Sequence, residues 1–185
     1  MFIREAKVED AASLLDLLHR LDRESKFMLV EPGERETTLE EQKAILESFS
    51  NSSSKTMLIA CEDEQVVGFV IGVGNTLNRN KHSLFCVIGV QQRSAGKGIG
   101  RQLLIDLEIW AYKQGFTRME LTVMCHNERA KGLYQSRGFE IEGVKRRSLI
   151  ADGEYVDEYY MSKLFEACHS DQERQASQKK SQSVA

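Results

Sequence analysis

The sequence contains few residues that staple or stiffen a chain from outside its core. It has a single proline, Pro32, together with four cysteines and four histidines, and no C-x-x-C pair. Three of the cysteines lie inside apolar, strand-like runs, where a free thiol behaves as a small hydrophobic group. We therefore expect neither a disulfide framework nor a metal site, and the cysteine pattern indicates a reducing compartment.

Long apolar runs and a strong net charge are missing as well. No stretch approaches the ~18 apolar residues of a membrane span, and residues 1–5 lack the apolar core of a signal peptide. The formal net charge is only -3, whereas a nucleic-acid-binding domain is usually basic. We expect a cytoplasmic protein that binds neither membrane nor nucleic acid, and we assign the basic run 145–147 to a solvated strand face.

The composition that remains is that of an ordinary soluble domain. The 185 residues are 41% hydrophobic and 29% charged, and this length is enough for one domain with a real core. From Glu166 the chain becomes rich in Gln, Lys and Ser and almost free of apolar residues. We expect a single domain over residues 1–165 and a disordered polar tail over 166–185.

Hydrophobic periodicity and turn residues predict the elements of the domain. The predicted helices span residues 8–22, 39–49, 98–113 and 127–137. The predicted strands span residues 2–6, 56–61, 66–73, 83–90, 118–124, 139–150 and 154–163. Thr38 and Glu41 form a capping box before the second helix, and the Asp152-Gly153 turn joins the last two strands. The order predicts a mixed α/β fold with one sheet and helices on its faces.

One strand and one loop stand out in this pattern. The strand 83–90 is nearly all apolar, which predicts a central strand buried on both faces. A glycine-rich run follows it directly and leads into the helix 98–113: Arg93-Ser94-Ala95-Gly96-Lys97-Gly98-Ile99-Gly100. A helix start carries unpaired N–H groups and partial positive charge, and glycines let a ligand approach the backbone. The run therefore predicts a pyrophosphate cradle, although the same glycines would also suit a tight turn without a ligand.

Spacing separates the cofactor families that use such cradles. A Walker P-loop needs Ser or Thr after its lysine and Gly at its first position, but Gly98 follows Lys97 and Gln91 occupies the first position. A Rossmann fingerprint needs a third glycine, where this chain has Arg101. Glu120 lies at a suitable distance for a ribose ligand, so a nucleotide-dependent oxidoreductase is a minor alternative.

Two separated motifs resemble those of the GNAT superfamily of N-acetyltransferases. Arg93-x-x-Gly96-x-Gly98 is similar to the Q/R-x-x-G-x-G/A signature, and residues 127–139 are similar to the N-x-x-A-x-x-L-Y-x-x-x-G-F segment. The likeness covers roughly residues 2–164. Residues 31–34, His82 and the segment 152–157 resemble a bacterial subgroup of small GNAT acetyltransferases.

The resemblance implies a fold and an activity. The fold would be a single GNAT-like domain with a central, mostly antiparallel sheet of about seven strands and about four helices. The activity would be transfer of an acetyl group from acetyl-CoA, without a metal, to a primary amine by direct attack in a ternary complex. The acceptor would be a small amine, an amino acid or a protein N-terminus. The alternative is a catalytically silent acyl-CoA-binding module, and open strand edges in this fold often pair in homodimers.

The resemblance also implies site residues. The acetyl carbonyl and pantetheine would lie along Ile88, Gly89 and Val90, where Gly89 suits a β-bulge. The phosphates would bind to the loop formed by Arg93, Ser94, Ala95, Gly96, Lys97, Gly98, Ile99, Gly100 and Arg101. Asn127 would bind the pantetheine arm, although Asn is also a common helix N-cap.

Tyr134 is the residue that the resemblance places beside the sulfur, as the general acid for the departing thiolate. The alternative is that Tyr134 only packs on its helix. The base is open: Glu31, His82 and Glu120 are candidates for a base or an acceptor-site residue, and each has an ordinary surface role as its alternative. Any such base could act through a water molecule.

Overall fold

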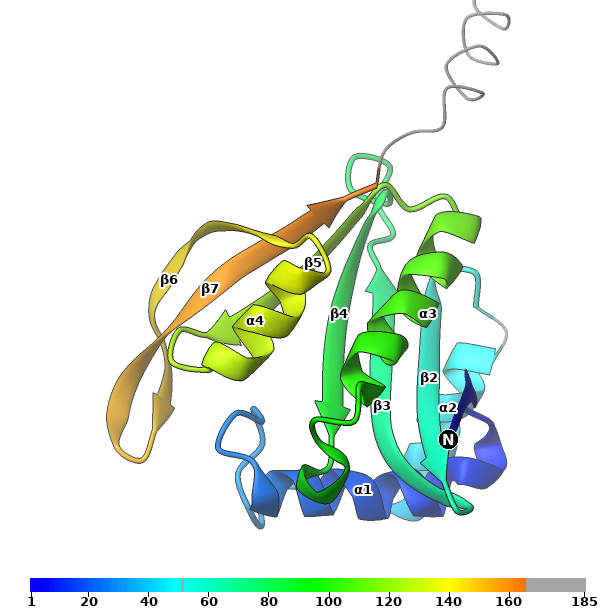
Figure 1. Ribbon diagram of the computed structural model, residues 1–185. Helices are drawn as coiled ribbons and strands as arrows, with labels where there is room; N and C mark the ends of the chain where they lie inside the picture. The colour runs from blue at the N-terminus through cyan, green and yellow to red at the C-terminus, as the bar shows by residue number, and fades with distance from the viewer. Residues whose placement is uncertain (51, 166–185) are drawn as a thin grey trace, which may run out of the picture.

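A computed structural model describes residues 1–50 and 52–165 (Figure 1), so the predicted polar tail lies outside the described residues. The described residues form one seven-stranded sheet in the order β1-β2-β3-β4-β5-β7-β6. The strands are β1 (Phe2–Glu5), β2 (Lys55–Glu62), β3 (Gln65–Gly74), β4 (Ser83–Val90), β5 (Arg118–Met124), β6 (Glu140–Ala151) and β7 (Glu154–Leu164). The α-helices are α1 (Ala11–Glu24), α2 (Leu39–Ser50), α3 (Ile99–Lys113) and α4 (Glu128–Ser136).

Local sequence signals set the boundaries of these elements. The predicted capping box is present at α2, where Glu41 N donates to Thr38 Oγ1 over 3.2 Å and Thr38 N donates to Glu41 Oε2 over 2.8 Å. Both tight hairpins turn through residues with positive φ: Asp152 at 52° and Gly153 at 80°, and the pair at 63 and 64 between β2 and β3. Two such residues in succession match the twist of the flanking strands. The first predicted helix is divided, because residues 8–10 form a 3-10 turn before α1.

The sheet has one parallel contact, and it is incomplete. Every neighbouring pair is antiparallel except β4 and β5, which run parallel. Their register extends only from Ser83 opposite Arg118 to Phe85 opposite Glu120. Beyond that point the two strands diverge, as Figure 1 shows between β4 and the strand β5 behind α4. The sheet therefore has an opening between β4 and β5, beyond Phe85 and Glu120.

Helices cover the two faces of the sheet unequally. A Cβ atom on Gly72 would meet Leu107 of α3, whereas one on Gly89 would meet Leu21 of α1, so α3 and α1 lie on opposite faces. The larger core cluster joins α3 and α4 to the sheet, and the smaller joins α1 and α2 to β2 and β3. The α1 face of β4 and β5 is thus less completely covered.

The prediction that β4 is buried on both faces is wrong for this reason. Phe85 is 37% and Val87 is 41% exposed, although their neighbours Leu84 and Cys86 are buried under α3. α1 packs against β3 and α2 against β2, so neither helix covers the middle of β4. An apolar central strand that keeps one face open can contact a ligand there.

Within the described residues, no helix is both long and apolar enough to cross a membrane.

Candidate active site

The opening between β4 and β5 is the framework of the candidate site. The ladder between the two strands ends at Phe85 and Glu120, so the backbone of residues 86–90 has no strand partner on that side. β4 then ends at Val90 and leads into the glycine loop, while α4 begins shortly after β5 ends. The unpaired edge of β4, the start of α3 and the helix α4 therefore lie close together.

The glycine loop carries the donors that an anion needs. Gly98 is the N-cap of α3 with φ of 83°, and Gly96 has φ of 81°. A Cβ atom on either residue would meet no atom of residues 1–50 and 52–165 within 4 Å. The first helical bond runs from Gln102 N to Gly98 O over 3.0 Å. Among the described residues, none accepts a hydrogen bond from the N–H groups of 96–101. These donors, at the positive end of a helix dipole, suit a pyrophosphate.

The N–H groups at the beginning of the loop are used within the loop itself. Ser94 N and Ala95 N donate to carbonyl groups of the preceding turn over 3.1 and 3.0 Å. Arg101 is exposed on the first turn of α3. Gly100 serves packing, because a Cβ atom there would lie 3.2 Å from Leu133 of α4 and close to the side chains of Ile88 and Val90. Among the predicted phosphate residues, those at 96–101 thus keep N–H donors that no described residue uses, whereas Ser94 and Ala95 use theirs within the loop.

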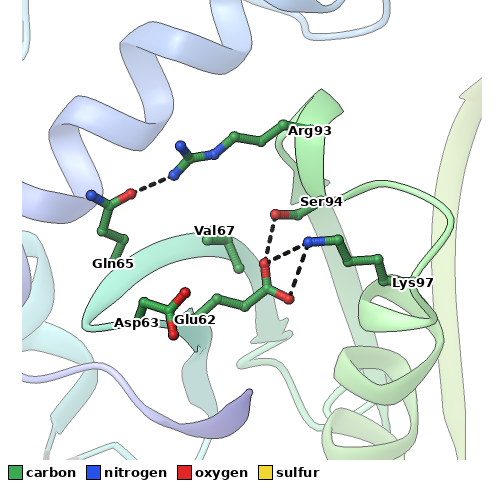
Figure 2. A pocket seen from close by; sticks show the side chains of 7 residues that line it. All are labelled: Glu62, Asp63, Gln65, Val67, Arg93, Ser94 and Lys97. Carbon is green, nitrogen blue, oxygen red and sulfur yellow. Dashed lines mark hydrogen bonds and ion pairs between the residues drawn. The ribbon is translucent and has the colours of Figure 1, made fainter.

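Side chains of the loop face the β2–β3 hairpin across a pocket of about 330 Å³ (Figure 2). Glu62 accepts hydrogen bonds from Ser94 Oγ over 2.9 Å and from Lys97 Nζ over 3.1 Å. These two contacts hold the pKa of the Glu62 carboxyl below its ordinary value. Arg93 donates to the side chain of Gln65. The loop therefore brings two cationic side chains to the pocket, and Glu62 at the end of β2 orients one of them, Lys97.

Gly89 does not form the predicted β-bulge. Residues 84–90 pair with β3 without a register shift, and Gly89 lies opposite Phe69. A Cβ atom on Gly89 would come within 2.7 Å of Phe69 and 2.8 Å of Leu21. Glycine is needed here for packing against α1, and the β4 backbone is opened by the divergence of β5 instead.

Tyr134 lies on α4 in the larger core, with 7% exposure. Its ring centroid is 5.9 Å from that of Phe139. Burial raises the pKa of the Tyr134 phenol above its ordinary value, and the interaction with Cys86 adds to this. Burial likewise raises the pKa of Cys86 to about 12. Both groups are therefore protonated at neutral pH.

Asn127 caps α4, as its alternative interpretation predicted. Its Oδ1 accepts a hydrogen bond from Ala130 N over 3.1 Å. The side-chain oxygen is thus partly committed to the helix start, and the cap fixes where α4, and with it Tyr134, begins.

The three base candidates lie in different environments. Glu120 lies at the last paired position of β4 and β5 and accepts a hydrogen bond from Arg118 Nε over 3.0 Å. His82 is exposed at the opposite end of β4 from the glycine loop, roughly 25 Å away at the usual rise per strand residue. Glu31 is exposed in the loop between α1 and α2, where its N–H donates to Glu34 over 2.8 Å. Of the three, Glu120 is the one that lies where β4 and β5 separate.

The loop after α1 contacts the far side of the opening, a feature that the sequence did not indicate. Lys26 Nζ lies 2.9 Å from Asp152 Oδ2 in the turn of the β6–β7 hairpin. The ring centroids of Phe27 and His126, which follows β5, are 5.3 Å apart. The loop 25–37 therefore spans from α1 toward β5 and the β6–β7 turn, close to the uncovered face of the sheet.

Strands β5 and β7 carry further residues that sequence reasoning missed. Tyr160 of β7 is 44% exposed and pairs with Thr122 of β5. Burial alone would raise the pKa of Glu158, but hydrogen bonds from Thr122, Ser148 and Lys145 lower it. In the sequence, the only signal for Tyr160 and Glu158 was the alternation of side chains along β7, and this alternation does not show which face of the sheet is uncovered.

Within residues 1–50 and 52–165, no cluster of His, Cys, Asp and Glu could hold a metal ion.

Comparisons with known proteins agree with this geometry. A sequence model described as the acetyltransferase (GNAT) family matches residues 15–139. An L-amino acid N-acetyltransferase from Escherichia coli is 34% identical over 108 residues, which cover 58% of this chain and 67% of that protein. The crystal structure of a GNAT family acetyltransferase from Streptococcus pneumoniae has a TM-score of 0.86 at 32% identity, over 89% of this chain and 99% of that one.

A third comparison concerns the fold alone. A putative acetyltransferase from Salmonella typhimurium, solved with its cofactor acetyl-CoA, has a TM-score of 0.80 at 20% identity and covers 91% of this chain and 95% of that one. The family model covers more than half of the chain, and its match includes the glycine loop, the opening between β4 and β5, and α4. The chain belongs to the acetyltransferase (GNAT) family and is an acetyltransferase.

Proposed function

We propose that this protein transfers the acetyl group of acetyl-CoA to the primary amine of a small acceptor by direct attack in a ternary complex. The observation that carries the proposal is the row of unpaired N–H groups at residues 96–101, which continues the open backbone edge of β4. A pyrophosphate on the loop would leave the pantetheine arm to run along β4 and its thioester to lie between the diverging strands.

The chemistry follows from this arrangement. The neutral amine attacks the thioester carbon, the carbonyl oxygen becomes negatively charged, and the C–S bond then breaks to give an amide and the thiolate of coenzyme A. Unpaired N–H groups of residues 86–90 are suited to stabilise the oxyanion, since preorganised donors act on charge as it develops. The attacking nitrogen must also lose a proton, and the thiolate must gain one.

Tyr134 is the proposed donor of the proton that the thiolate gains. Its raised pKa keeps the phenol protonated at neutral pH, and α4 holds it in the core where it interacts with Cys86 of β4. Glu120, at the point where β4 and β5 separate, is the proposed recipient of the amine proton through a water molecule. Its Oε2 accepts a hydrogen bond from Arg118 Nε over 3.0 Å, which fixes the orientation of the carboxylate.

The acceptor is proposed to carry apolar groups beside its amine. Phe85 and Val87 present apolar surface on the uncovered face of β4, and Tyr160 lies on the same face of β7. An L-amino acid is the first acceptor class to test, since the Escherichia coli relative is named for that activity. A protein N-terminus with an apolar first residue is the second, because it presents the same groups.

A turnover screen tests the proposal. Release of the coenzyme A thiol is followed with acetyl-CoA and single amines: apolar, polar and charged L-amino acids, and short peptides with a free N-terminus. We expect release that depends on an apolar amino acid or N-terminus. Tight binding of acetyl-CoA without amine-dependent release from any acceptor would instead support the silent acyl-CoA-binding module.

A further inference from the structure

A line of side-chain hydrogen bonds runs behind the glycine loop. Arg20 of α1 donates from Nη1 to Gln91 Oε1 over 3.1 Å, and Gln91 Nε2 donates to Ser94 Oγ over 3.2 Å. Ser94 Oγ donates to Glu62 Oε2 over 2.9 Å, and Lys97 Nζ reaches the same oxygen over 3.1 Å (Figure 2). The line therefore joins α1, the loop and the end of β2.

The chemistry of the groups fixes the direction of each bond. A guanidinium only donates, so the Gln91 amide must turn its oxygen to Arg20 and its NH₂ group to Ser94. The single hydroxyl proton of Ser94 is then free to bond the Glu62 carboxylate, which only accepts when ionised. Gln91 is 0% and Ser94 is 1% exposed, so water cannot replace either partner. Breaking the line would leave buried polar groups unpaired.

The line of hydrogen bonds ends at Lys97, within the segment 96–101 whose N–H groups have no partner among the described residues. A second contact from α1 supports the same segment, since Gln92 N donates to Glu24 Oε2 over 2.9 Å. Residues 91–94 are therefore tied to α1 and β2, whereas no atom of the described residues lies within 4 Å of the Cβ positions of Gly96 and Gly98. Glycine-rich segments lose much conformational freedom when they close around a ligand. Tying down the residues just before them removes part of that loss before the ligand arrives.

We propose that Gln91 and Glu62 are positioning residues, which act through Ser94 to hold the glycine loop in its anion-binding conformation. The inference rests on the proposed function, because the anion is the pyrophosphate of acyl-CoA. It adds that the affinity for the cofactor depends on two further side chains: Gln91, just after β4, and Glu62, at the end of β2. The lowered pKa of Glu62 agrees, since its first cause is the hydrogen bond from Ser94.

The test compares the same substitution at two adjacent positions. Gln91→Met keeps the length of the side chain but removes the hydrogen bonds, and Gln92→Met is the control, because the Gln92 side chain is exposed and has no hydrogen bond among the described residues. We expect Gln91→Met to raise the Kd of coenzyme A in calorimetry and the KM of acetyl-CoA by about tenfold, with kcat at saturation unchanged. Gln92→Met should match the wild type.

A truncated substrate separates a phosphate effect from general damage. S-acetylpantetheine has the thioester but no phosphate, so Gln91→Met should leave its kcat/KM at the wild-type value. Equal losses with both substrates would show that the substitution disturbs the whole site and would overturn the proposal. Glu62→Ala should reproduce the loss for acetyl-CoA, and Glu62→Gln should restore most of it, since the amide oxygen still accepts from Ser94.

The outcomes distinguish the two proposals. If the wild-type protein binds no coenzyme A, the proposed function is wrong and the positioning role falls with it. If the wild-type protein binds and Gln91→Met and Gln92→Met bind equally well, only the positioning role is wrong. Should Gln91→Met fail to fold in thermal unfolding, the comparison of Glu62→Ala with Glu62→Gln decides, because the Glu62 side chain is 24% exposed whereas Gln91 is fully buried.

Discussion

At the scale of single residues, the site combines groups that depend on burial with groups that depend on open backbone. The Tyr134 side chain projects from α4 into the larger core cluster, and burial is the first cause of its raised pKa. Gly98 is exposed, and its value lies in a positive φ and an absent side chain. One substitution can therefore change the buried phenol and leave the exposed loop intact, and another can change the loop and leave the phenol intact.

Replacing Tyr134 by Phe should lower kcat by about 10²–10⁴-fold, because the ring and its packing remain but the proton is lost. The Kd of acetyl-CoA should stay near the wild-type value, since the phosphates bind elsewhere. Stopped-flow single-turnover rates and calorimetry check the two parts. A wild-type single-turnover rate in Tyr134→Phe would remove this residue from the mechanism and leave solvent as the proton donor.

Replacing Gly98 by Val should weaken acetyl-CoA binding by several kcal/mol, because the new side chain would occupy the space of the phosphates and strain a residue with positive φ. Gly115→Val is the matched control: Gly115 has φ of 85° and open space at its Cβ position, but lies beyond the other end of α3. Both variants should lose similar thermal stability. Only Gly98→Val should lose affinity, and equal affinity in the two would contradict the cradle.

At the scale of elements, an ion cluster joins the helix that carries Tyr134 to α3 and β7. Glu108 of α3 accepts from Arg137, which follows α4, and from Lys163 of β7, each over 2.7 Å. The side chain of Glu108 is 11% exposed, and those of both cations are 19% exposed. Because these charged groups are largely shielded from solvent, their contacts hold α3, α4 and β7 together, although the three elements are not consecutive in the chain.

Removing Glu108 should therefore cost far more than removing an exposed carboxylate. Glu108→Ala leaves two largely buried cations unpaired, and we expect a loss of about 3–5 kcal/mol in the free energy of unfolding. Glu40→Ala breaks a helix-surface pair with Lys43 in which the carboxylate is 80% exposed, and it should cost at most ~1 kcal/mol. Urea unfolding of both variants checks the difference, and similar losses would show that the cluster contributes no more than a surface pair.

The sequence predicted the elements well because their signals are local. Capping residues, turn pairs such as Asp152-Gly153 and hydrophobic periodicity each act within a few residues, and the strand 118–124 was predicted to its ends. The open face of β4 was missed, since exposure of Phe85 depends on where α1 and α2 stop covering the sheet. Gly89 was misassigned to a bulge for the same reason, because its contact with Leu21 joins positions far apart in the chain.

At the scale of the whole molecule, hydrogen-bonded carboxylates set the response of stability to acid. Contacts with Arg118 and Ser162 lower the pKa of Glu142 from 4.5 to about 2, and a hydrogen bond from Arg4 lowers that of Asp10. A depressed pKa means that the unfolded chain binds more protons than the folded one as pH falls below about 4.5. Their contribution is complete at neutral pH and is lost as pH falls from about 4.5 toward 2.

The melting temperature should therefore fall steeply in this acid range and change little between about pH 6 and 8. Glu142→Gln should lower stability at neutral pH and flatten the acid decline, because it removes one of the groups responsible. Thermal unfolding followed by circular dichroism across this pH range measures both effects. A decline of wild-type steepness in Glu142→Gln would mean that the Glu142 contacts do not stabilise the fold.

The central claim is that an acetyl group passes from coenzyme A to an amine in this protein. The direct measurement is NMR of a reaction that contains acetyl-CoA labelled with ¹³C at the acetyl carbonyl, the protein, and a mixture of apolar L-amino acids. We predict that the label moves from the thioester to an amide, with one free thiol released for each amide formed, and that Tyr134→Phe slows this transfer. Label that stays in the thioester, or that appears only as free acetate, would contradict the account.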